Sequence, residues 1–220
     1  MNTVSGQNAP VRDDTAKDEA ARDKAARDKA VFGVLALQGA FAKHVEALRG
    51  CGVEAMEVRT EAQLDSVDAL VIPGGESTTM SKLLVSQGLT EPLRTRLDAG
   101  MPVLGTCAGM ILLASEIIDA RSEQFSFDRI DLAVQRNGYG RQIASFETDL
   151  DIEGLDAPFR AVFIRAPKVD RVGPDVEVLA TVEGVPVLCR SGQTMVASFH
   201  PELTNDTRLH GLFIETVVRA

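Results

Sequence analysis

The residues best suited to chemistry are a cysteine set between glycines. Cys107 lies in "GTCAGM", after the apolar run Met101–Leu104 and before the run Met110–Leu113. The pattern G-x-C-x-G is the thiol counterpart of the G-x-S-x-G nucleophile elbow, in which a strand turns sharply into a helix. A helix N-terminus favours the nucleophilic thiolate, and the amide of Ala108 would face a developing oxyanion. A small buried packing corner explains the same residues, so this segment alone leaves both interpretations open.

A thiol nucleophile needs a base, and the chain has three histidines. His200 follows the predicted strand "TMVASF" and begins "HPE". Pro201 favours extended geometry at His200, and side chains at i and i+2 of an extended segment share a side. Glu202 is therefore predicted to orient His200 as the acid of a catalytic triad does; the alternative is a capping turn. His44 and His210 lie in predicted helices, and we assign both to packing or the surface.

A third candidate is "PGGES", residues 73–77, which follows another predicted strand. Its glycine pair lets backbone amides approach a ligand closely. Gly75 is thus a candidate second donor to an oxyanion, and Glu76 and Ser77 are candidates for binding polar groups of a substrate. The alternative is an ordinary turn in which Ser77 caps the next helix.

The composition excludes several classes of function. The 220 residues can bury one sizeable core, and a net charge of −9 disfavours nucleic acid as a partner. No apolar run approaches the roughly 18 residues of a membrane span, and no secretory signal is evident, so we expect a cytoplasmic protein. Three widely spaced cysteines indicate neither a disulfide framework nor zinc, and no other metal or cofactor pattern occurs. Cys51 and Cys189 are interpreted as packing residues.

The chain divides into a tail and one domain. Residues 1–30 contain no Leu, Ile or Phe and repeat AARDK, which predicts a disordered tail with some helical tendency in 15–30. Residues 31–220 are predicted to form the single globular domain.

Alternating strands and helices fill the first half of that domain, which predicts an α/β fold: a three-layer, mostly parallel, doubly wound, flavodoxin-like sheet. After about residue 129, short strands separated by turns predict an antiparallel extension of the same sheet. The predicted strands of the first half are Val31–Leu37, Val53–Val58 and Asp68–Ile72, with a fourth before Cys107. The predicted helices are Phe41–Arg49, Thr79–Gln87, Glu91–Ala99, Ala108–Ile118 and a last one near Asp206–Val218.

Taken together, six segments resemble, in order and spacing, the glutaminase subunits of pyridoxal 5′-phosphate synthases, a branch of the class I (triad) glutamine amidotransferases. They are "GVLALQGAFAKH", "LVIPGGESTTM", "GTCAGMILLA", "RNGYGRQ", "FIRAP" and "SFHPELT", and the resemblance covers about residues 31–219. G-x-C-x-G with H-P-E is typical of the class, and "PGGESTTM" and "FIRAP" are typical of the vitamin B6 branch. The chain departs from the family at Phe127 and Asp128, where small residues are expected, and at Tyr139, where Phe is usual.

The resemblance implies hydrolysis of L-glutamine to L-glutamate and ammonia without cofactor or metal. In its terms Cys107 attacks the side-chain amide and forms a glutamyl thioester, His200 transfers the proton and Glu202 orients His200. Gly75 and Ala108 would donate their amides to the oxyanion. The ammonia would pass, within a hetero-oligomer, to a TIM-barrel synthase subunit that builds pyridoxal phosphate from a pentose phosphate and a triose phosphate. The residues implied to hold L-glutamine are Gly75, Glu76, Ser77, Arg136, Ile164 and Arg165.

Three other functions fit parts of the pattern. A glutaminase serving another acceptor, such as imidazole-glycerol-phosphate synthesis, shares the triad but does not explain "GGESTTM" or "FIRAP". A cysteine peptidase on the same fold would not need the glutamine-binding residues. A non-catalytic binding module is disfavoured because Cys107, His200 and Glu202 are all present.

Overall fold

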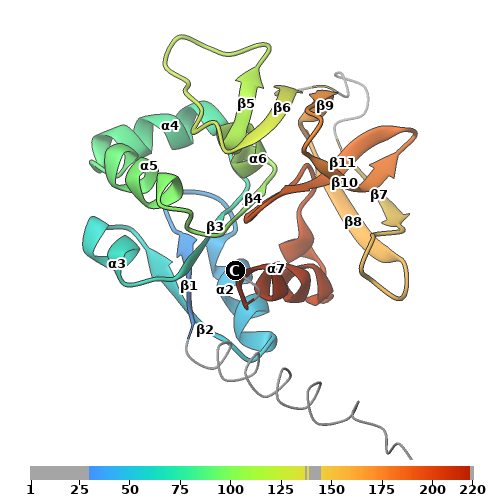
Figure 1. Cartoon of the computed structure of the whole chain (residues 1–220), viewed down its shortest axis with the longest axis horizontal. Coiled ribbons are helices and arrows are strands. Elements are labelled where there is room, and N and C mark those ends of the chain that lie inside the picture. The colour runs from blue at the N-terminus through green and yellow to red at the C-terminus, as the bar shows by residue number, and fades with distance from the viewer. Residues whose placement is uncertain (1–29, 137, 139–144, 219–220) are drawn as a thin grey trace, which may run out of the picture.

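A seven-stranded sheet forms the centre of the protein, in the order β10-β11-β12-β4-β3-β1-β2 (Figure 1). The computed structural model describes residues 30–136, 138 and 145–218, so the predicted tail, except for Ala30, lies outside the described residues. The run from β2 to β12 is parallel, and β11 and β10 add to it antiparallel, which confirms the predicted fold class. The strands are β1 (Val31–Leu35), β2 (Glu54–Val58), β3 (Ala69–Ile72), β4 (Val103–Thr106), β10 (Glu177–Val182), β11 (Val185–Ser191) and β12 (Thr194–Ala197).

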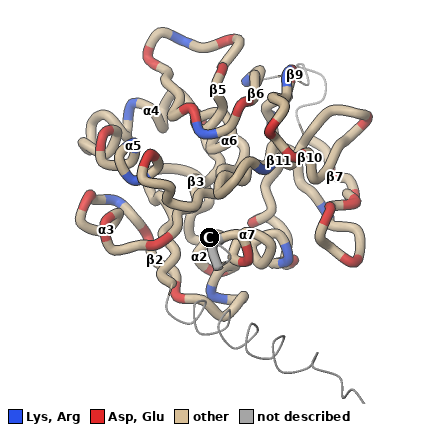
Figure 2. The backbone as a smooth tube through the Cα atoms, in the orientation of Figure 1, with Lys and Arg blue, Asp and Glu red and all other residues tan. Residues whose placement is uncertain are grey.

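Helices cover both faces of this sheet and form the two outer layers of a three-layer arrangement (Figure 1). All four residues of β3 are buried, and they alternate between two cores: Leu70 and Ile72 face one cluster, and Ala69 and Val71 the other. Such a continuous apolar run is what a parallel strand covered on both faces requires. Figure 2 shows the charged residues on the surrounding helices and outer strands, whereas β3 carries none. The helices on the first cluster are α3 (Glu61–Asp65), α4 (Ser77–Ser86), α5 (Thr90–Asp98) and α6 (Ala108–Leu113); those on the second are α2 (Phe41–Gly50) and α7 (Arg208–Val218).

The predicted helix Ala108–Ile118 is wrong in its second half. Helix α6 ends at Leu113, where Ala114 turns to extended geometry (φ −62°, ψ 150°) and begins strand β5, Ala114–Ile117. Strand β5 pairs in parallel with β6, Ile130–Gln135. The backbone groups of this segment thus find partners in a sheet, which an apolar run read alone does not reveal.

The predicted extension of the main sheet is only partly correct. Strands β10 and β11 join it antiparallel and β12 joins it in parallel with β4, but the other strands of this half lie in two small sheets. One contains β5, β6 and β9 (Lys168–Val172), and the other pairs β7 (Ser145–Leu150) with β8 (Phe159–Ile164). Helix α3 was not predicted, although Thr60 and Gln63 form a capping box at its start.

Candidate active site

Three neighbouring parallel strands deliver the predicted site to one edge of the sheet. Residues 73–77 follow the carboxyl end of β3, Cys107 follows β4, and His200 comes shortly after β12. Because parallel strands end at the same edge, segments far apart in sequence meet there. Ligands of open α/β sheets bind at this edge.

Cys107 sits on a strained turn between β4 and α6. Its backbone has φ 49° and ψ −101°, a conformation that L-residues rarely adopt. Its amide is fixed by a 2.8 Å hydrogen bond to the Ala197 carbonyl. A Cβ on Gly109 would stand 2.1 Å from the Ile72 carbonyl oxygen, and one on Gly105 would stand 2.7 Å from the Gly109 backbone. Both glycines are therefore needed for the elbow that the pattern predicts.

His200 and Glu202 form a pair beside the cysteine, with the imidazole partly exposed to the cavity. His200 Nδ1 lies 2.8 Å from Glu202 Oε1, and the Glu202 side chain is fully buried. The contact is as predicted, but its local geometry is not: residues Pro201–Leu203 form a 3₁₀ turn instead of an extended segment. The turn is closed by a 3.3 Å hydrogen bond from the Leu203 amide to the His200 carbonyl.

Electrostatics favours a charged His200–Glu202 pair. Burial lowers the pKa of His200, but hydrogen bonds and charges from Cys107 and Glu202 raise it by more, to about 10. Burial likewise raises the pKa of Glu202, but its contacts with His200 and His44 hold it far below its ordinary value. At neutral pH the arrangement thus favours an imidazolium next to an ionised carboxylate.

The loop after β3 approaches the other side of Cys107. Gly75 has φ +152°, in the region that favours glycine, and a Cβ there would lie 2.9 Å from Gln38 Oε1. The same Gln38 oxygen accepts a 3.1 Å hydrogen bond from the Glu76 amide. A Cβ on Gly74 would stand 2.3 Å from His200 Cε1 and 3.3 Å from Cys107 Cβ. This loop is therefore glycine-rich because it passes directly over the cysteine and the imidazole.

Glu76, and not Ser77, caps helix α4. The Glu76 carboxylate accepts from the amides of Thr78 at 3.1 Å and Thr79 at 2.7 Å. Burial raises the pKa of Glu76, but these hydrogen bonds lower it to about 2. The alternative that Ser77 forms the cap is thus wrong; its hydroxyl instead accepts a 2.9 Å hydrogen bond from Gln124 Nε2.

An arginine completes the polar wall beside Glu76. The Arg136 side chain is only 9% exposed, and its Nη2 lies 3.2 Å from Glu76 Oε1. Its amide donates to Asp119 Oδ1 at 2.8 Å. Arg136 Nε is buried and has no hydrogen-bond partner among the described residues. A guanidinium with a donor to spare is well suited to a carboxylate ligand.

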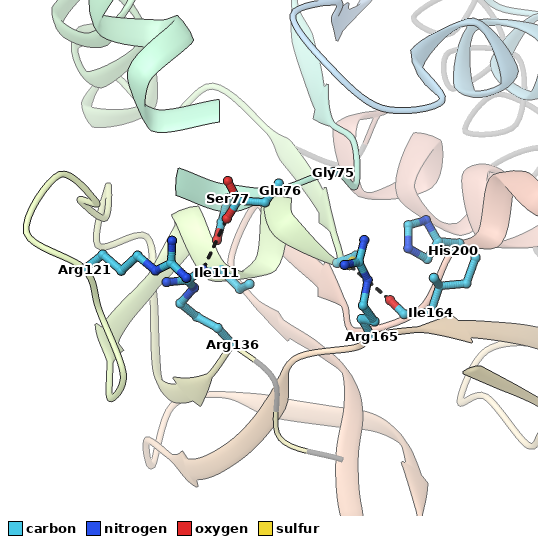
Figure 3. A pocket seen from close by; sticks show the side chains of 10 residues that line it. Gly75, Glu76, Ser77, Ile111, Arg121, Arg136, Ile164, Arg165 and His200 are labelled. Atoms are coloured by element: carbon cyan, nitrogen blue, oxygen red, sulfur yellow. Dashed lines mark hydrogen bonds and ion pairs between the residues drawn. The ribbon is translucent and has the colours of Figure 1, made fainter. Parts of the chain in front are cut away.

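These residues enclose a cavity of about 480 Å³ (Figure 3), a size typical of sites for small molecules. Most of the residues predicted from sequence line it, and Ala108 and Glu202 are buried behind them. The Ile164 carbonyl oxygen lies 4.0 Å from Cys107 Sγ, and Arg165 adopts φ +45°. The lining consists of Gly75, Glu76, Ser77, Cys107, Ile111, Arg121, Arg136, Ile164, Arg165 and His200.

Two of the lining residues were not predicted, Ile111 and Arg121. Ile111 lies one helical turn after Cys107 on α6, so the predicted helix after the cysteine could have indicated that it faces the site. Arg121 lies in the segment between β5 and β6, and in Figure 3 its side chain extends toward Arg136. No feature of the sequence marks it. Of the departures from the family, Phe127 is fully buried, Asp128 has φ +54°, and Tyr139 lies outside the described residues.

The remaining histidines and cysteines were only partly predicted. His44 and His210 are both fully buried and lie against each other, so a surface position is wrong for both. Cys189 is buried in β11, where burial raises the pKa of its thiol to about 12. Cys51 is half-buried, with Sγ 3.5 Å from the Thr207 carbonyl. Within the described ranges, no group of three His, Cys, Asp or Glu residues is placed to hold a metal ion, and no helix is long and apolar enough to cross a membrane.

A methyl group on Gly74 is expected to disable the site. Gly74→Ala would place a Cβ 2.3 Å from His200 Cε1, so the imidazole must move away from Cys107. Because displacements of about 1 Å at a reacting group cost on the order of a hundredfold, we expect kcat for the glutamine hydrolysis that the resemblance implies to fall by about that factor. Gly50→Ala is the control, since its Cβ would meet only Thr207 Cγ2, at 3.7 Å. A wild-type kcat in Gly74→Ala would show that the added methyl group does not displace the His200 imidazole.

The fold and the site together define a class I glutamine amidotransferase: a thiol elbow, an imidazole and a buried carboxylate at the carboxyl edge of a largely parallel sheet. A solved structure described as a glutamine amidotransferase is 49% identical, with a TM-score of 0.79 over 84% of this chain and 98% of its own. A glutamine amidotransferase from Thermotoga maritima shares the fold at 14% identity, with a TM-score of 0.54 over 86% of this chain and 98% of its own.

The chain belongs to the SNO glutamine amidotransferase family, whose sequence pattern matches residues 34–219. It is 57% identical over 185 residues to the pyridoxal 5′-phosphate synthase subunit PdxT of Mycobacteroides abscessus, covering 84% of this chain and 96% of that protein. It is 58% identical over 188 residues to the PdxT subunit of Mycolicibacterium vanbaalenii, with the same two coverages.

Proposed function

We propose that this chain hydrolyses L-glutamine through a thioester on Cys107 and hands the ammonia to a synthase subunit. Its relatives at 54–58% identity identify it as the glutaminase subunit of a pyridoxal 5′-phosphate synthase, an enzyme of vitamin B6 biosynthesis. The observation that carries the mechanism is the meeting of Cys107, His200 and the Glu76–Arg136 pair in one cavity.

The first half-reaction forms the thioester. Cys107 Sγ attacks the carbonyl carbon of the glutamine side chain, and the C=O electron pair moves onto oxygen. The amides of Gly75 and Ala108 stabilise that oxyanion; Ala108 is the first residue of α6, and amides at the start of a helix have no acceptor within it. As the tetrahedral intermediate collapses, the C–N bond breaks and His200 donates its proton to the leaving nitrogen, which departs as ammonia.

The second half-reaction restores the enzyme. His200, now neutral, removes a proton from a water molecule, whose oxygen attacks the thioester carbon. The C–S bond breaks, L-glutamate leaves, and the thiolate and the imidazolium are regenerated. Throughout the reaction the hydrogen bond between His200 Nδ1 and Glu202 Oε1, 2.8 Å long, keeps one proton on Nδ1. Nε2 is therefore the nitrogen that exchanges protons.

The cavity wall matches the two charges of a free amino acid. Arg136 is placed to bind the α-carboxylate through its guanidinium group, and the carboxylate of Glu76 and the Ile164 carbonyl are acceptors for the α-ammonium group. Ser77, beside Glu76, and Arg165, beside Ile164, complete the proposed glutamine site (Figure 3).

The ammonia goes to a TIM-barrel synthase subunit in the hetero-oligomer. Docking of that subunit is the means by which we expect the glutaminase to be activated. The reaction takes place in the cytoplasm, where a catalytic thiol stays reduced. Neither nucleic acid nor a cofactor takes part.

Ammonia release from L-glutamine tests this function directly, measured with the full chain alone and then in the presence of its partner synthase. Strong stimulation by the synthase is the expected result and identifies both the reaction and the partner. An equal rate of ammonia release with and without the synthase would contradict the proposed partner and favour a glutaminase that serves another acceptor. No release in either case would contradict the proposal and favour a non-catalytic binding module.

Arg136→Gln is expected to weaken glutamine binding. The amide keeps polar atoms at the wall but loses the charge, so KM should rise by about tenfold or more with a smaller change in kcat, since a charged hydrogen bond contributes roughly 1.5–3 kcal/mol. Steady-state kinetics with glutamine measures both constants. Arg190→Gln is the matched control, because Arg190 pairs with Glu177 on β10 and β11, away from the cavity that Arg136 lines. An unchanged KM in Arg136→Gln would remove the arginine from the site.

A further inference from the structure

Two buried histidines lie directly behind the triad, and the mechanism above does not use them. His44 is on α2 and His210 is on α7, and both side chains are fully buried. His44 Nδ1 lies 2.9 Å from His210 Nε2, so one ring must donate to the other. Burying two imidazoles in an apolar core is costly unless their polar atoms are paired.

The other nitrogen of His44 faces the triad carboxylate. His44 Nε2 lies 3.2 Å from Glu202 Oε2, and the Thr106 hydroxyl is 3.4 Å from the same nitrogen. Glu202 Oε1 is already occupied by His200 Nδ1, at 2.8 Å. Glu202 Oε2 is buried and has no hydrogen bond of good geometry among the described residues, so His44 Nε2 at 3.2 Å is a short approach and not yet an aligned bond. His44 is therefore the donor within reach of the second oxygen.

The pairing fixes the proton positions along the whole chain of rings. His210 Nδ1 has no hydrogen-bond partner among the described residues, so a proton there would be a buried unsatisfied donor. The proton of His210 thus belongs on Nε2, where it is donated to His44 Nδ1. Since Nδ1 of His44 accepts, its own proton lies on Nε2, the nitrogen that lies 3.2 Å from Glu202 Oε2 and 3.4 Å from the Thr106 hydroxyl. Burial and the neighbouring His44 lower the pKa of His210 to about 3, although Glu202 acts in the opposite direction, which agrees with a neutral ring.

We propose that His44 and His210 are positioning residues of the glutaminase: His210 sets the tautomer of His44, and His44 holds the second carboxylate oxygen of Glu202. Glu202 then presents Oε1 to His200 in a single orientation. The inference rests on the proposed function, and it extends the triad by two residues that come from two different helices. It gives both histidines a role that burial alone does not explain.

The titratable groups that bear on the triad carboxylate are few. Glu202 is faced by His200 from its own turn and by His44 from α2. His44 is faced in turn by His210 from α7, and Cys107 lies on the far side of His200. Removing the His44 donor takes away one of the contacts that lower the pKa of Glu202, so that pKa should rise. The acid limb of the kcat/KM profile should then move to higher pH.

Four variants of the full chain, assayed with the synthase subunit, test this inference. His44→Leu removes the donor at similar volume, whereas the side-chain amide of His44→Gln can still donate to Glu202. We expect His44→Leu to lower kcat about tenfold or more with KM unchanged, as for a lost hydrogen bond to a charged group, and to shift the acid limb upward. His44→Gln should recover most of both. His210→Leu should shift the limb in the same direction by less, because His44 then loses its tautomer constraint.

Val45→Ala is the control for packing on α2, since Val45 is buried next to His44 in sequence and its apolar side chain cannot donate a hydrogen bond to Glu202. It should lower the melting temperature and leave the pH profile unchanged. If His44→Leu and His44→Gln lose activity equally with a wild-type acid limb, the histidines only pack and the inference is overturned. If His44→Leu does not fold, His210→Leu decides, and a wild-type profile there overturns the inference. Absence of ammonia release in the wild type would instead refute the proposed function.

Discussion

Cys107→Ala is expected to lower ammonia release from glutamine by about four orders of magnitude or more, as loss of a covalent nucleophile does in other triad enzymes. The methyl group cannot form the thioester, and neither Cys51 nor Cys189 lines the cavity. Binding to the synthase subunit should be unchanged, because the substitution removes only the buried sulfur at the elbow. Steady-state ammonia release measures the first effect, and sedimentation of the mixed subunits measures the second.

The control for Cys107→Ala is Cys51→Ser, which alters a half-buried thiol and keeps a donor to the Thr207 carbonyl. It should retain wild-type turnover. Comparable turnover in Cys107→Ala would falsify the assignment of the nucleophile, whatever the outcome with the synthase.

Glu202→Gln is expected to lower kcat by about three to four orders of magnitude, the range seen when a triad acid becomes an amide. The carboxylate faces a nitrogen at each oxygen, His200 at 2.8 Å and His44 at 3.2 Å. An amide has only one acceptor oxygen, so one of the two nitrogens must lose its acceptor. Either His200 would lose the acceptor that fixes its tautomer, or His44 would lose the carboxylate oxygen beside its Nε2.

The pH dependence of Glu202→Gln should change in a defined direction. In the wild type, burial lowers the pKa of His200, and Cys107 and Glu202 raise it to about 10. The charged form of His200 therefore stabilises the fold fully below its ordinary pKa of 6.5, and this contribution is lost as pH rises through about 10. Without the Glu202 charge the pKa of His200 falls, so this contribution should be smaller and its loss should be complete at a lower pH.

Urea unfolding of both proteins between about pH 6 and 10 measures that difference. The gap in the free energy of unfolding should be largest near pH 6 and narrow as the wild-type imidazolium deprotonates. A gap that is constant over this range would show that Glu202 stabilises the fold without acting on His200. Wild-type kcat in the variant would remove Glu202 from the catalytic machinery.

The parts of the site that follow strands could be predicted from sequence. Cys107 lies between two apolar runs with small residues on both sides, so a turn between strand and helix is the arrangement that places it. The loop at Gly75 follows from the strand before it in the same way. The main sheet could also be predicted, because parallel strands buried on both faces give apolar runs that few other structures require.

What could not be predicted depends on contacts between distant segments. The short segment Ala114–Ile117 suits a helix or a strand equally well, and only its pairing with β6 decides between the two. His44 lies in an amphipathic helix, and no local signal shows that its partners are Glu202 and His210. A 3₁₀ turn at Pro201, and not the expected extended segment, brings Glu202 to His200. Either conformation can bring residues two positions apart into contact, so the contact was predicted although the backbone geometry was not.

The strained backbone at Cys107 has a consequence for the newly made chain. The Ala197 carbonyl of β12 accepts from the Cys107 amide, and the Ile72 carbonyl packs against Gly109. The histidine that serves Cys107, His200, comes later in the sequence than all of these residues. These contacts span much of the sequence, and such long-range contacts form late in folding. A nascent chain that has not yet emerged beyond residue 202 therefore holds the sulfur without the conformation or the proton donor that glutamine cleavage needs. The catalytic site is therefore expected to assemble only when β12 and the turn that follows it at His200 have formed.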